Sequence, residues 1–183
     1  STQFRCSGPF EKITPSPRCW IYPGAHGNLN VSAGIQNSCN NFFYEVGYRL
    51  GSSGDSYDSN LGLEKLAYYA DMYGLTETSG IEITESDPQV STEDAVRSAI
   101  GQGSNNFTTV GLARYVTTVA NSGTCYNLTL IDKITDHNNN LLIDNQAEIR
   151  NHIEMDSSYW KAIHSGMRGV VENKAYFNIG VDV

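Results

Sequence analysis

The chain has 183 residues, of which 39% are hydrophobic and 17% are charged, and its formal net charge is −8. This length and composition predict a folded globular piece with one ordinary core. The negative charge argues against nucleic acid or an anionic membrane surface as a partner, because there is no basic patch to release counterions from phosphates. We see no signal peptide and no apolar run approaching the roughly 18 residues of a membrane span, so we expect any export signal or anchor to lie outside this chain.

The first half of the chain begins with an irregular segment and continues with a helical pair. Residues 1–25 show little periodicity and contain four prolines, which predicts a surface loop or extended segment. Residues 26–51 predict a short helix, a tight polar break over residues 37–41 and a second helix. Apolar residues of the second helix recur at the spacing of one helix face: Phe42, Phe43, Val46 and Leu50. Gly51 stands where a helix would end in a left-handed cap.

The rest of the chain alternates between helical and period-two segments. A polar turn over residues 52–60 precedes them, and the sequence SerThrGluAsp at residues 91–94 is a helix-start signature. The predicted elements are helices over 63–73 (ending at Gly74), 95–101 and 109–121, a hairpin formed by 126–135 and 141–148, a helix over 156–171 and a strand over 175–183.

These elements predict an α+β fold class that is mostly helical, with a small antiparallel hairpin. No internal repeat or linker divides the chain, so we predict a single unit over residues 1–183. The predicted sheet is too small to stand alone beside so many helices. We therefore expect the helical lobe of a larger two-lobed fold.

Four cysteines are present, at positions 6, 19, 39 and 125. None forms a C-x-x-C pair and no histidine cluster lies near them in the sequence, so we expect no zinc site, and nothing indicates another metal or cofactor. Cys6 and Cys19 bracket a twelve-residue loop rich in proline and glycine. In an exported domain they could form a disulfide that contributes on the order of 3 kcal/mol through loop entropy. Two unrelated buried thiols explain the pattern equally well.

The polar break between the first two helices is the candidate functional site. Ser38 and Asn40 place a hydroxyl and a carboxamide two residues apart, at the junction of two packed helices. Such a junction presents polar groups rigidly.

The triplet Ser38-Cys39-Asn40 resembles Ser-x-Asn, the second active-site motif of the penicillin-binding proteins, the D,D-transpeptidases that cross-link peptidoglycan. Three further segments are similar to that family: NNFFYEVGYRLG directly after the triplet, AIGQG before a helix that starts at a threonine, and the helix WKAIHSGMRGVV. These landmarks occur in the family's order and cover nearly the whole chain. The resemblance implies the penicillin-binding transpeptidase and serine β-lactamase-like fold, whose central sheet comes mostly from chain before and after this region.

The resemblance also implies roles for individual residues. Ser38 would pass a proton between the lysine beside the nucleophile and the leaving nitrogen. Asn40 would hydrogen-bond the carbonyl group of the substrate peptide and help to hold that lysine, whereas Cys39 is the variable middle position without a chemical role. Gly101, Gln102 and Gly103 would lie near the cleft and support its wall.

The family's other two motifs are not present in usable form. Neither Lys-Thr-Gly nor Lys-Ser-Gly occurs in the sequence, and the one literal Ser-x-x-Lys, from Ser158 to Lys161, follows the Ser-x-Asn triplet instead of preceding it. We interpret Ser158 and Lys161 as solvated residues of a helix whose apolar face is formed by Trp160, Ile163, Met167 and Val170. The chain would then be an incomplete transpeptidase domain, and we expect it to have no turnover by itself.

Other polar clusters have ordinary explanations. A second literal Ser-x-Asn at 104–106 lies in a glycine-flanked turn, and the four histidines are scattered, with none beside a nucleophile elbow. Glu82, Glu85 and Asp87 could imitate the paired carboxylates of a glycosidase, but an acidic loop is the simpler interpretation.

The family resemblance finally implies partners and location for the parent protein. These are stem peptides ending in D-Ala-D-Ala, β-lactam antibiotics and the missing parts of the chain's own domain. The parent would act outside the cytoplasm, anchored in the bacterial membrane. Two alternatives stay open: a β-lactam sensor that does not cross-link, and a noncatalytic wall-binding or interaction domain of the same fold.

Overall fold

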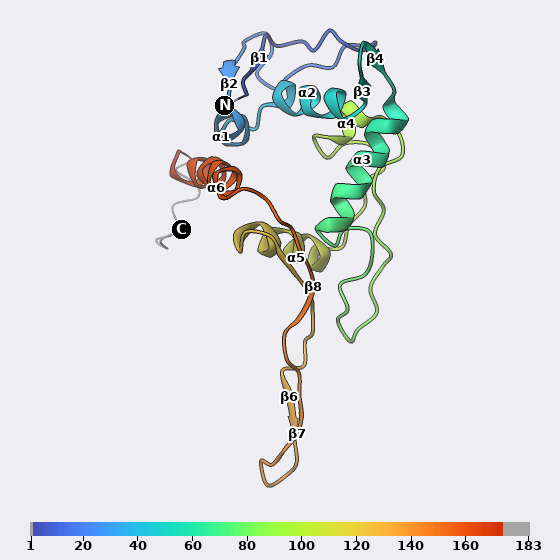
Figure 1. Ribbon diagram of the computed structural model, residues 1–183, viewed down its shortest axis with the longest axis vertical. Coiled ribbons are helices and arrows are strands. Elements are labelled where there is room, and N and C mark those ends of the chain that lie inside the picture. Colours follow the sequence, from blue (N-terminus) through green and yellow to red (C-terminus); the bar gives the residue numbers. More distant parts are fainter. Residues whose placement is uncertain (1, 174–183) are drawn as a thin grey trace. The chain divides into compact units, whose positions relative to one another are not determined.

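The computed structural model describes residues 2–173, and Figure 1 labels their elements. Contacts divide the chain into two compact units, the first formed by Ser1–Leu66, Ser91–Gly103 and Met155–Val183 and the second by Ala67–Val90 and Ser104–Glu154. These are packing units of a chain that passes repeatedly from one to the other, so the single domain expected over 1–183 stays a prediction. The strand expected over 175–183 lies outside the described residues.

The elements alternate between helices and short antiparallel strand pairs. The first unit contains β1 (Phe4–Cys6), β2 (Gly27–Leu29), α1 (Val31–Gln36), α2 (Asn40–Leu50), β3 (Ser52–Ser53), β4 (Ser56–Tyr57), the beginning of α3 (Ser59–Met72), α4 (Ala95–Ser98) and α6 (Ser157–Glu172). The second contains the end of α3, α5 (Thr109–Ala120), β5 (Thr124–Asn127), β6 (Lys133–Thr135), β7 (Leu141–Asp144) and β8 (Glu148–His152). This composition confirms the predicted α+β, mostly helical class. Of the helices in the described part of the chain, none has the length and apolar character needed to cross a membrane.

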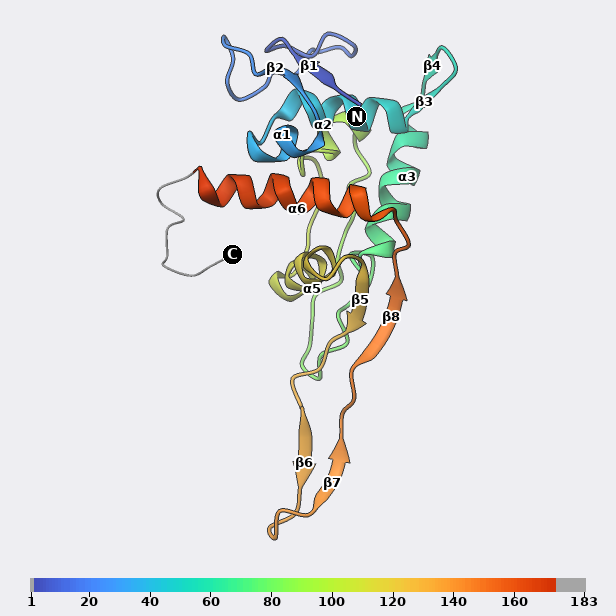
Figure 2. The same ribbon diagram turned by 60° about the vertical axis from the view of Figure 1, so that its left-hand side comes forward.

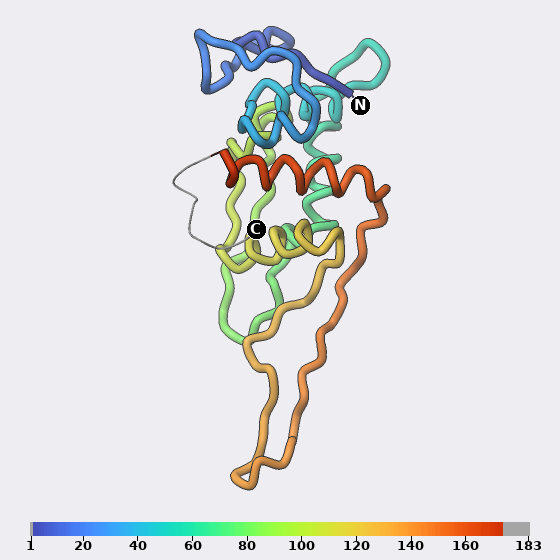
Figure 3. Tube along the Cα trace, turned by 90° about the vertical axis from the view of Figure 1, so that its left-hand side faces the viewer, coloured from blue at the N-terminus to red at the C-terminus, as the bar shows by residue number. Residues whose placement is uncertain are grey.

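The first unit packs α1 against both α2 and α6. At Gly34 of α1, an added Cβ would lie only 2.7 Å from the Phe42 ring of α2. At Gly166 of α6, a Cβ would lie 2.8 Å from the Ser32 carbonyl oxygen, and the Ser32 hydroxyl donates to the Ala162 carbonyl at 2.7 Å. Figures 2 and 3 show α6 running beside α1. Glycine at these points allows the helices to approach closely.

The buried face of α6 differs in part from the predicted apolar face. Trp160 is buried as expected, but the other buried positions are Gly166 and Gly169, and Met167 is 38% exposed. The packing of α6 therefore depends on small residues against α1 and not on a continuous apolar stripe. Ser158 and Lys161 are both exposed, in keeping with the interpretation that they are solvated helix residues.

Helices α2, α3 and α4 meet at Ala95, which is fully buried at the beginning of α4. A Cβ added at Gly47 of α2 would lie 2.5 Å from the Ala95 carbonyl oxygen, and one at Gly62 of α3 would lie 2.6 Å from the Ala95 Cβ. Asp94 caps α4 by accepting a hydrogen bond from the Arg97 amide at 2.8 Å, as its helix-start signature predicted. This junction holds α4 against α2.

The left-handed cap predicted at Gly51 is wrong. Gly51 has φ −84° and ψ −2°, which is right-handed helical conformation. Its lack of a side chain serves close packing instead, because a Cβ there would lie 2.5 Å from the Asp58 carbonyl oxygen. Gly74 after α3 does take the predicted left-handed conformation, with φ +69°.

The second unit is organised around the buried side chain of Arg114 in α5. Its guanidinium donates to the carbonyl oxygens of Ser79 at 3.3 Å, Glu77 at 3.1 Å and Gly74. These bonds hold the segment that follows α3 against α5. A Cβ at Gly74 would lie 2.6 Å from the Arg114 Nε, so glycine also provides the space that the guanidinium needs.

The predicted hairpin is present as two consecutive strand pairs. β5 pairs with β8 near its base, and β6 pairs with β7 toward its tip (Figure 2). The acidic loop supports the second unit through its carboxylates. Glu82 accepts from the Leu130 amide at 2.8 Å and from the Thr129 hydroxyl, and Glu85 accepts from the Ser79 amide at 2.8 Å.

Candidate active site at the Ser38–Asn40 turn

The turn between α1 and α2 is a helix-ending motif with serine in the position that glycine usually occupies. The Ser38 amide donates to the Ile35 carbonyl at 2.9 Å and the Cys39 amide donates to the Gly34 carbonyl at 3.0 Å, which are the two hydrogen bonds of a Schellman motif. Ser38 has φ +47°, in the left-handed region. A side chain there costs on the order of 1 kcal/mol, so the chain keeps a hydroxyl where glycine would be less strained.

Several groups hold this turn in place. The indole N–H of Trp20 donates to the carbonyl oxygens of Asn37 at 3.1 Å and Ser38 at 2.9 Å. The Asn37 side chain donates to the Ala33 carbonyl at 2.9 Å, and Cys39 is completely buried. Sequence reasoning missed Trp20, because nothing in the local pattern connects a tryptophan that is 59% exposed to a turn far along the chain.

Ser38 and Asn40 line the same open depression, of about 240 Å³, together with Phe43, Ala99 and Ile100. Ser38 is exposed and Asn40 is half-buried. Ala99 and Ile100 directly precede the Gly-Gln-Gly segment at 101–103, in which Gly101 and Gly103 have φ +82° and +84°. The role of this segment in supporting a cleft wall stays a prediction.

The environment of Asn40 includes a buried tyrosine one turn later in α2. Burial raises the pKa of Tyr44, while the charge of Arg97 and a hydrogen bond from the Asn40 side chain act to lower it. Arg97 itself pairs with Asp94 at 3.1 Å and donates to the Pro15 carbonyl at 2.7 Å. The Asn40 carboxamide therefore lies beside the neutral phenol of Tyr44. Hydrogen bonds and an ion pair of Arg97 join the neighbouring segments.

A cluster of sulfur and nitrogen atoms lies directly behind the turn. Cys39 Sγ is 3.9 Å from Cys19 Sγ, which is 3.6 Å from the Nδ1 atom of His26, and Cys6 completes the group. All four cysteines of the chain are free thiols in this structure, so it does not show the disulfide considered for Cys6 and Cys19. Sequence reasoning expected no zinc site and missed this cluster, because its members come singly from four separate segments.

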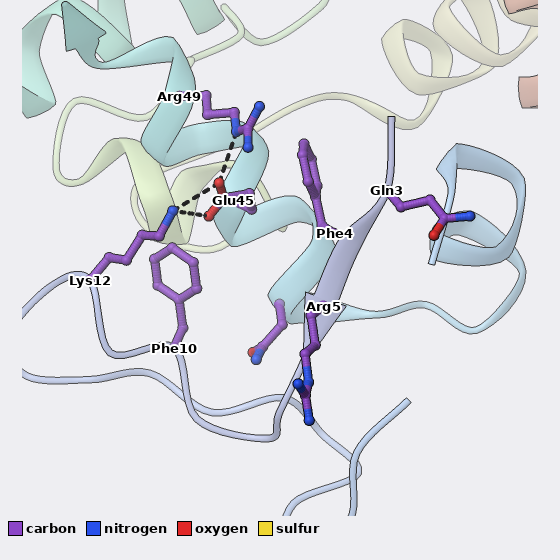
Figure 4. Close-up of a pocket in the computed structure, with 8 residues that line it drawn as sticks. Gln3, Phe4, Arg5, Phe10, Lys12, Glu45 and Arg49 are labelled. Carbon is purple, nitrogen blue, oxygen red and sulfur yellow. Dashed lines mark hydrogen bonds and ion pairs between the residues drawn. The ribbon is translucent and has the colours of Figure 1, made fainter. Parts of the chain in front are cut away.

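A second depression, of about 270 Å³, lies beside β1 and α2 (Figure 4). The Glu45 carboxylate there pairs with Lys12 Nζ at 2.7 Å and Arg49 Nε at 2.8 Å. Asn41 donates from Nδ2 to the Pro9 carbonyl at 3.0 Å. These contacts connect the N-terminal segment to α2 and stabilise the helix that carries Asn40.

Comparison with known proteins identifies the family. A model of the penicillin-binding protein transpeptidase domain matches residues 11–181. The chain belongs to the penicillin-binding protein transpeptidase family. This assignment confirms the resemblance carried by the Ser-Cys-Asn triplet and by the segments around it.

One individual relative is similar to this transpeptidase domain in sequence, and solved structures are similar to it in fold. Penicillin-binding protein 2A of Bacillus subtilis is 25% identical over 159 residues, which are 79% of this chain and 22% of that protein. The match to the structure of penicillin-binding protein 2B of Streptococcus pneumoniae covers 98% of this chain and 32% of the chain in that structure, with 22% identity and a TM-score of 0.80. The match to an imipenem acyl-enzyme complex of penicillin-binding protein A of Mycobacterium tuberculosis covers 94% of this chain and 39% of the chain in that structure, with 15% identity and a TM-score of 0.73. The chain thus spans about a fifth of its curated relative and about a third of these structures.

Proposed function

We propose that this transpeptidase domain is part of a serine D,D-transpeptidase that cross-links peptidoglycan stem peptides ending in D-Ala-D-Ala and binds β-lactams. The protein would act outside the cytoplasm, anchored in the membrane. The observation that carries the proposal is the Ser38–Asn40 turn, where a strained serine and a carboxamide line one depression. The acyl-enzyme complex of the related Mycobacterium protein supports the extension to β-lactams.

The chemistry of acyl transfer assigns each group a task. The reaction needs a nucleophile, a base, a proton route to the leaving amine and donors for the oxyanion. A hydroxyl can accept one proton while it donates another, so Ser38 suits the transfer of the nucleophile's proton from the neighbouring lysine to the leaving nitrogen. Asn40 offers an amide donor to the carbonyl group of the substrate peptide and an oxygen acceptor to the lysine.

The remaining groups would come from other parts of the protein. We expect the nucleophilic serine in a Ser-x-x-Lys motif and a second lysine in a Lys-Thr-Gly or Lys-Ser-Gly motif. The nucleophile would form an ester with the donor peptide as the terminal D-Ala leaves, and the amine of a second stem peptide would then attack that ester. Ser38 and Asn40 serve both steps without forming a covalent bond.

The test measures acylation of the full-length protein by penicillin, followed as an intact-mass adduct over time. We expect Ser38→Ala to slow acylation by about 10² to 10⁴-fold, the usual contribution of a positioned proton-transfer group. Ser165→Ala is the matched control, because Ser165 is an exposed serine of α6, and it should leave the rate unchanged.

Each other outcome has a distinct meaning. An unchanged rate in Ser38→Ala would contradict the role given to Ser38. Acylation of the wild type without cross-linking of a synthetic stem peptide would favour the β-lactam sensor. A wild-type protein that gains no adduct would favour the noncatalytic interaction domain.

A further inference from the structure

The cluster behind the turn gathers four side chains that are separated along the chain. Cys6 ends β1, Cys19 lies in the following loop, His26 directly precedes β2, and Cys39 is the N-cap of α2. One ligand atom from each lies within 4.8 Å of all the others. The three thiols are at most 2% exposed and the imidazole is half-buried. None of these four side chains takes part in the proposed transpeptidase chemistry, so the cluster needs a separate explanation.

The Cys19–Cys39 and Cys19–His26 separations match those of a tetrahedral zinc site, and the other ligand pairs lie within 4.8 Å. With Zn–S about 2.3 Å and Zn–N about 2.05 Å, a tetrahedral angle places two sulfurs about 3.8 Å apart and a sulfur and a nitrogen about 3.6 Å apart. The Cys19 and Cys39 sulfurs are 3.9 Å apart, and Cys19 Sγ is 3.6 Å from His26 Nδ1. A disulfide would require about 2.05 Å. We propose that Cys6, Cys19, His26 and Cys39 bind one Zn²⁺ ion.

The donor set indicates a structural ion. Three thiolates and one imidazole are a common ligand set for structural zinc, and four protein ligands leave no position for water or substrate. Soft sulfur ligands in a tetrahedron disfavour magnesium, calcium and manganese, which prefer oxygen ligands. The burial of all three sulfurs also separates the ion from bulk solvent.

The surroundings of the ligands suit metal binding. Backbone donors at Asn41, Ile21 and Asn40 interact with the Cys19 sulfur. The Nδ1 atom of His26 lies 3.6 Å from Cys19 Sγ, and in the neutral tautomer that carries its proton on Nε2 it offers a lone pair to a metal. Amide donors directed at a sulfur stabilise the thiolate in the same way as the outer shell of known metal sites.

Metal binding balances through proton release. When Zn²⁺ binds, three thiol protons leave to solvent and a complex of net charge −1 forms with the neutral imidazole. The step involves no electron transfer and needs only zinc ions from solution.

The position of Cys39 connects this ion to the candidate active site. Cys39 lies between Ser38 and Asn40, and its sulfur would be joined through the metal to Cys6, Cys19 and His26 of the N-terminal segment. The ion would therefore fix the turn through the buried side chain of Cys39. The middle residue of the triplet thus acquires a structural role.

The first test is the metal content of the full-length protein, purified with zinc in the growth medium and measured by plasma mass spectrometry. We expect one zinc ion per chain in the wild type and a loss of at least tenfold in Cys19→Ser and in Cys39→Ser. Cys125→Ser is the matched control, because Cys125 is equally buried but belongs to the second unit, and it should retain the ion.

A second measurement covers the case in which a serine variant fails to fold. Cobalt exchanged into the wild type should give the intense visible bands of a tetrahedral site together with sulfur-to-cobalt charge transfer. His26→Cys keeps the number of ligands at four and should keep the metal, with the charge-transfer intensity raised by roughly a third, since four thiolates replace three thiolates and an imidazole.

Three results would overturn the proposal. They are a wild-type protein without stoichiometric zinc, zinc retained in folded Cys19→Ser and Cys39→Ser, and a wild-type mass lower by two hydrogens with Cys6 joined to Cys19. Penicillin acylation is measured separately on zinc-loaded and zinc-free protein. Failure of the proposed function would abolish acylation and leave the zinc content unchanged.

Discussion

At the scale of single residues, Ser38 has a left-handed backbone conformation that favours glycine, whereas its proposed function needs a hydroxyl. Glycine is unstrained at φ +47°, whereas alanine and serine are both strained there. We therefore expect Ser38→Gly to be more stable than Ser38→Ala by about 0.5–1 kcal/mol, because glycine relieves the strain but adds freedom to the unfolded chain. Both variants lack the hydroxyl and should be acylated equally slowly.

The measurement is hydrogen exchange of α1 and α2 in the full-length protein, corrected for intrinsic rates. Exchange reports the local opening free energy of these helices, which global unfolding of a large protein would obscure. An alanine variant at least as stable as the glycine variant would show that Ser38 is not strained. Equal stability losses in both variants would instead point to a lost contact of the hydroxyl.

At the scale of elements, α1 and α6 pack closely where Gly166 meets Ser32. A Cβ at position 166 would lie 2.8 Å from the Ser32 carbonyl oxygen and 3.1 Å from the Ser32 Cα. Backbone atoms cannot rotate away as a side chain can, so Gly166→Ala should separate the two helices. We expect a loss of about 1–3 kcal/mol, the usual cost of overpacking.

This change is measured by hydrogen exchange in α1 and α6. Ser165→Ala, at an exposed position of the same helix, should have an effect within about 0.5 kcal/mol of zero. Penicillin acylation should slow in Gly166→Ala as well, because α1 ends at Gln36 and its C-cap, Asn37, directly precedes Ser38. Unchanged exchange in α1 would show that the two helices do not need their close approach.

The end of α3 and strand β8 are joined by charges that predict a pH dependence of the second unit. Arg150 pairs with Asp71 at 2.9 Å and with Glu77. The pKa of Asp71 is lowered from its ordinary value of 3.8, first by the hydrogen bond from Thr76 and also by the charge of Arg150. A lowered folded-state pKa stabilises the fold above the unfolded value, and that stability is lost as pH falls through the folded value.

We therefore expect Asp71→Asn to lower the melting temperature at pH 7, with the difference from the wild type shrinking as the pH falls below 3.8. Asp71 is largely exposed, so the difference should be small and should decrease with added salt. Thr76→Val removes the largest cause of the lowered pKa and should move the loss of stability to higher pH. A difference that stays constant from neutral to acid pH would contradict the role of Asp71.

At the scale of the whole molecule, sequence periodicity predicted most of the helices and the hairpin. The polar break between two predicted helices indicated the candidate Ser38–Asn40 site, whose role stays a prediction. These features depend on neighbours within a few residues, which a sequence displays directly. The proposed zinc ligands could not be predicted from the sequence, because Cys6, Cys19, His26 and Cys39 become neighbours only through tertiary packing. The prediction of a left-handed cap at Gly51 was wrong for a related reason. Glycine is required there by the close approach of Asp58 and not by the backbone angles of Gly51 itself.

We expect the 183-residue chain by itself to lack the groups that acylation needs. It contains Ser38 and Asn40 but lacks a Lys-Thr-Gly or Lys-Ser-Gly motif, and its one literal Ser-x-x-Lys has both end residues exposed on α6. Incubation with penicillin should therefore leave the intact mass of the 183-residue chain unchanged, whereas the full-length protein should gain one adduct. Acylation of the chain alone would place the nucleophile within these residues. Peptide mapping would then show whether Ser158 was interpreted wrongly, because the adduct would lie on the α6 peptide.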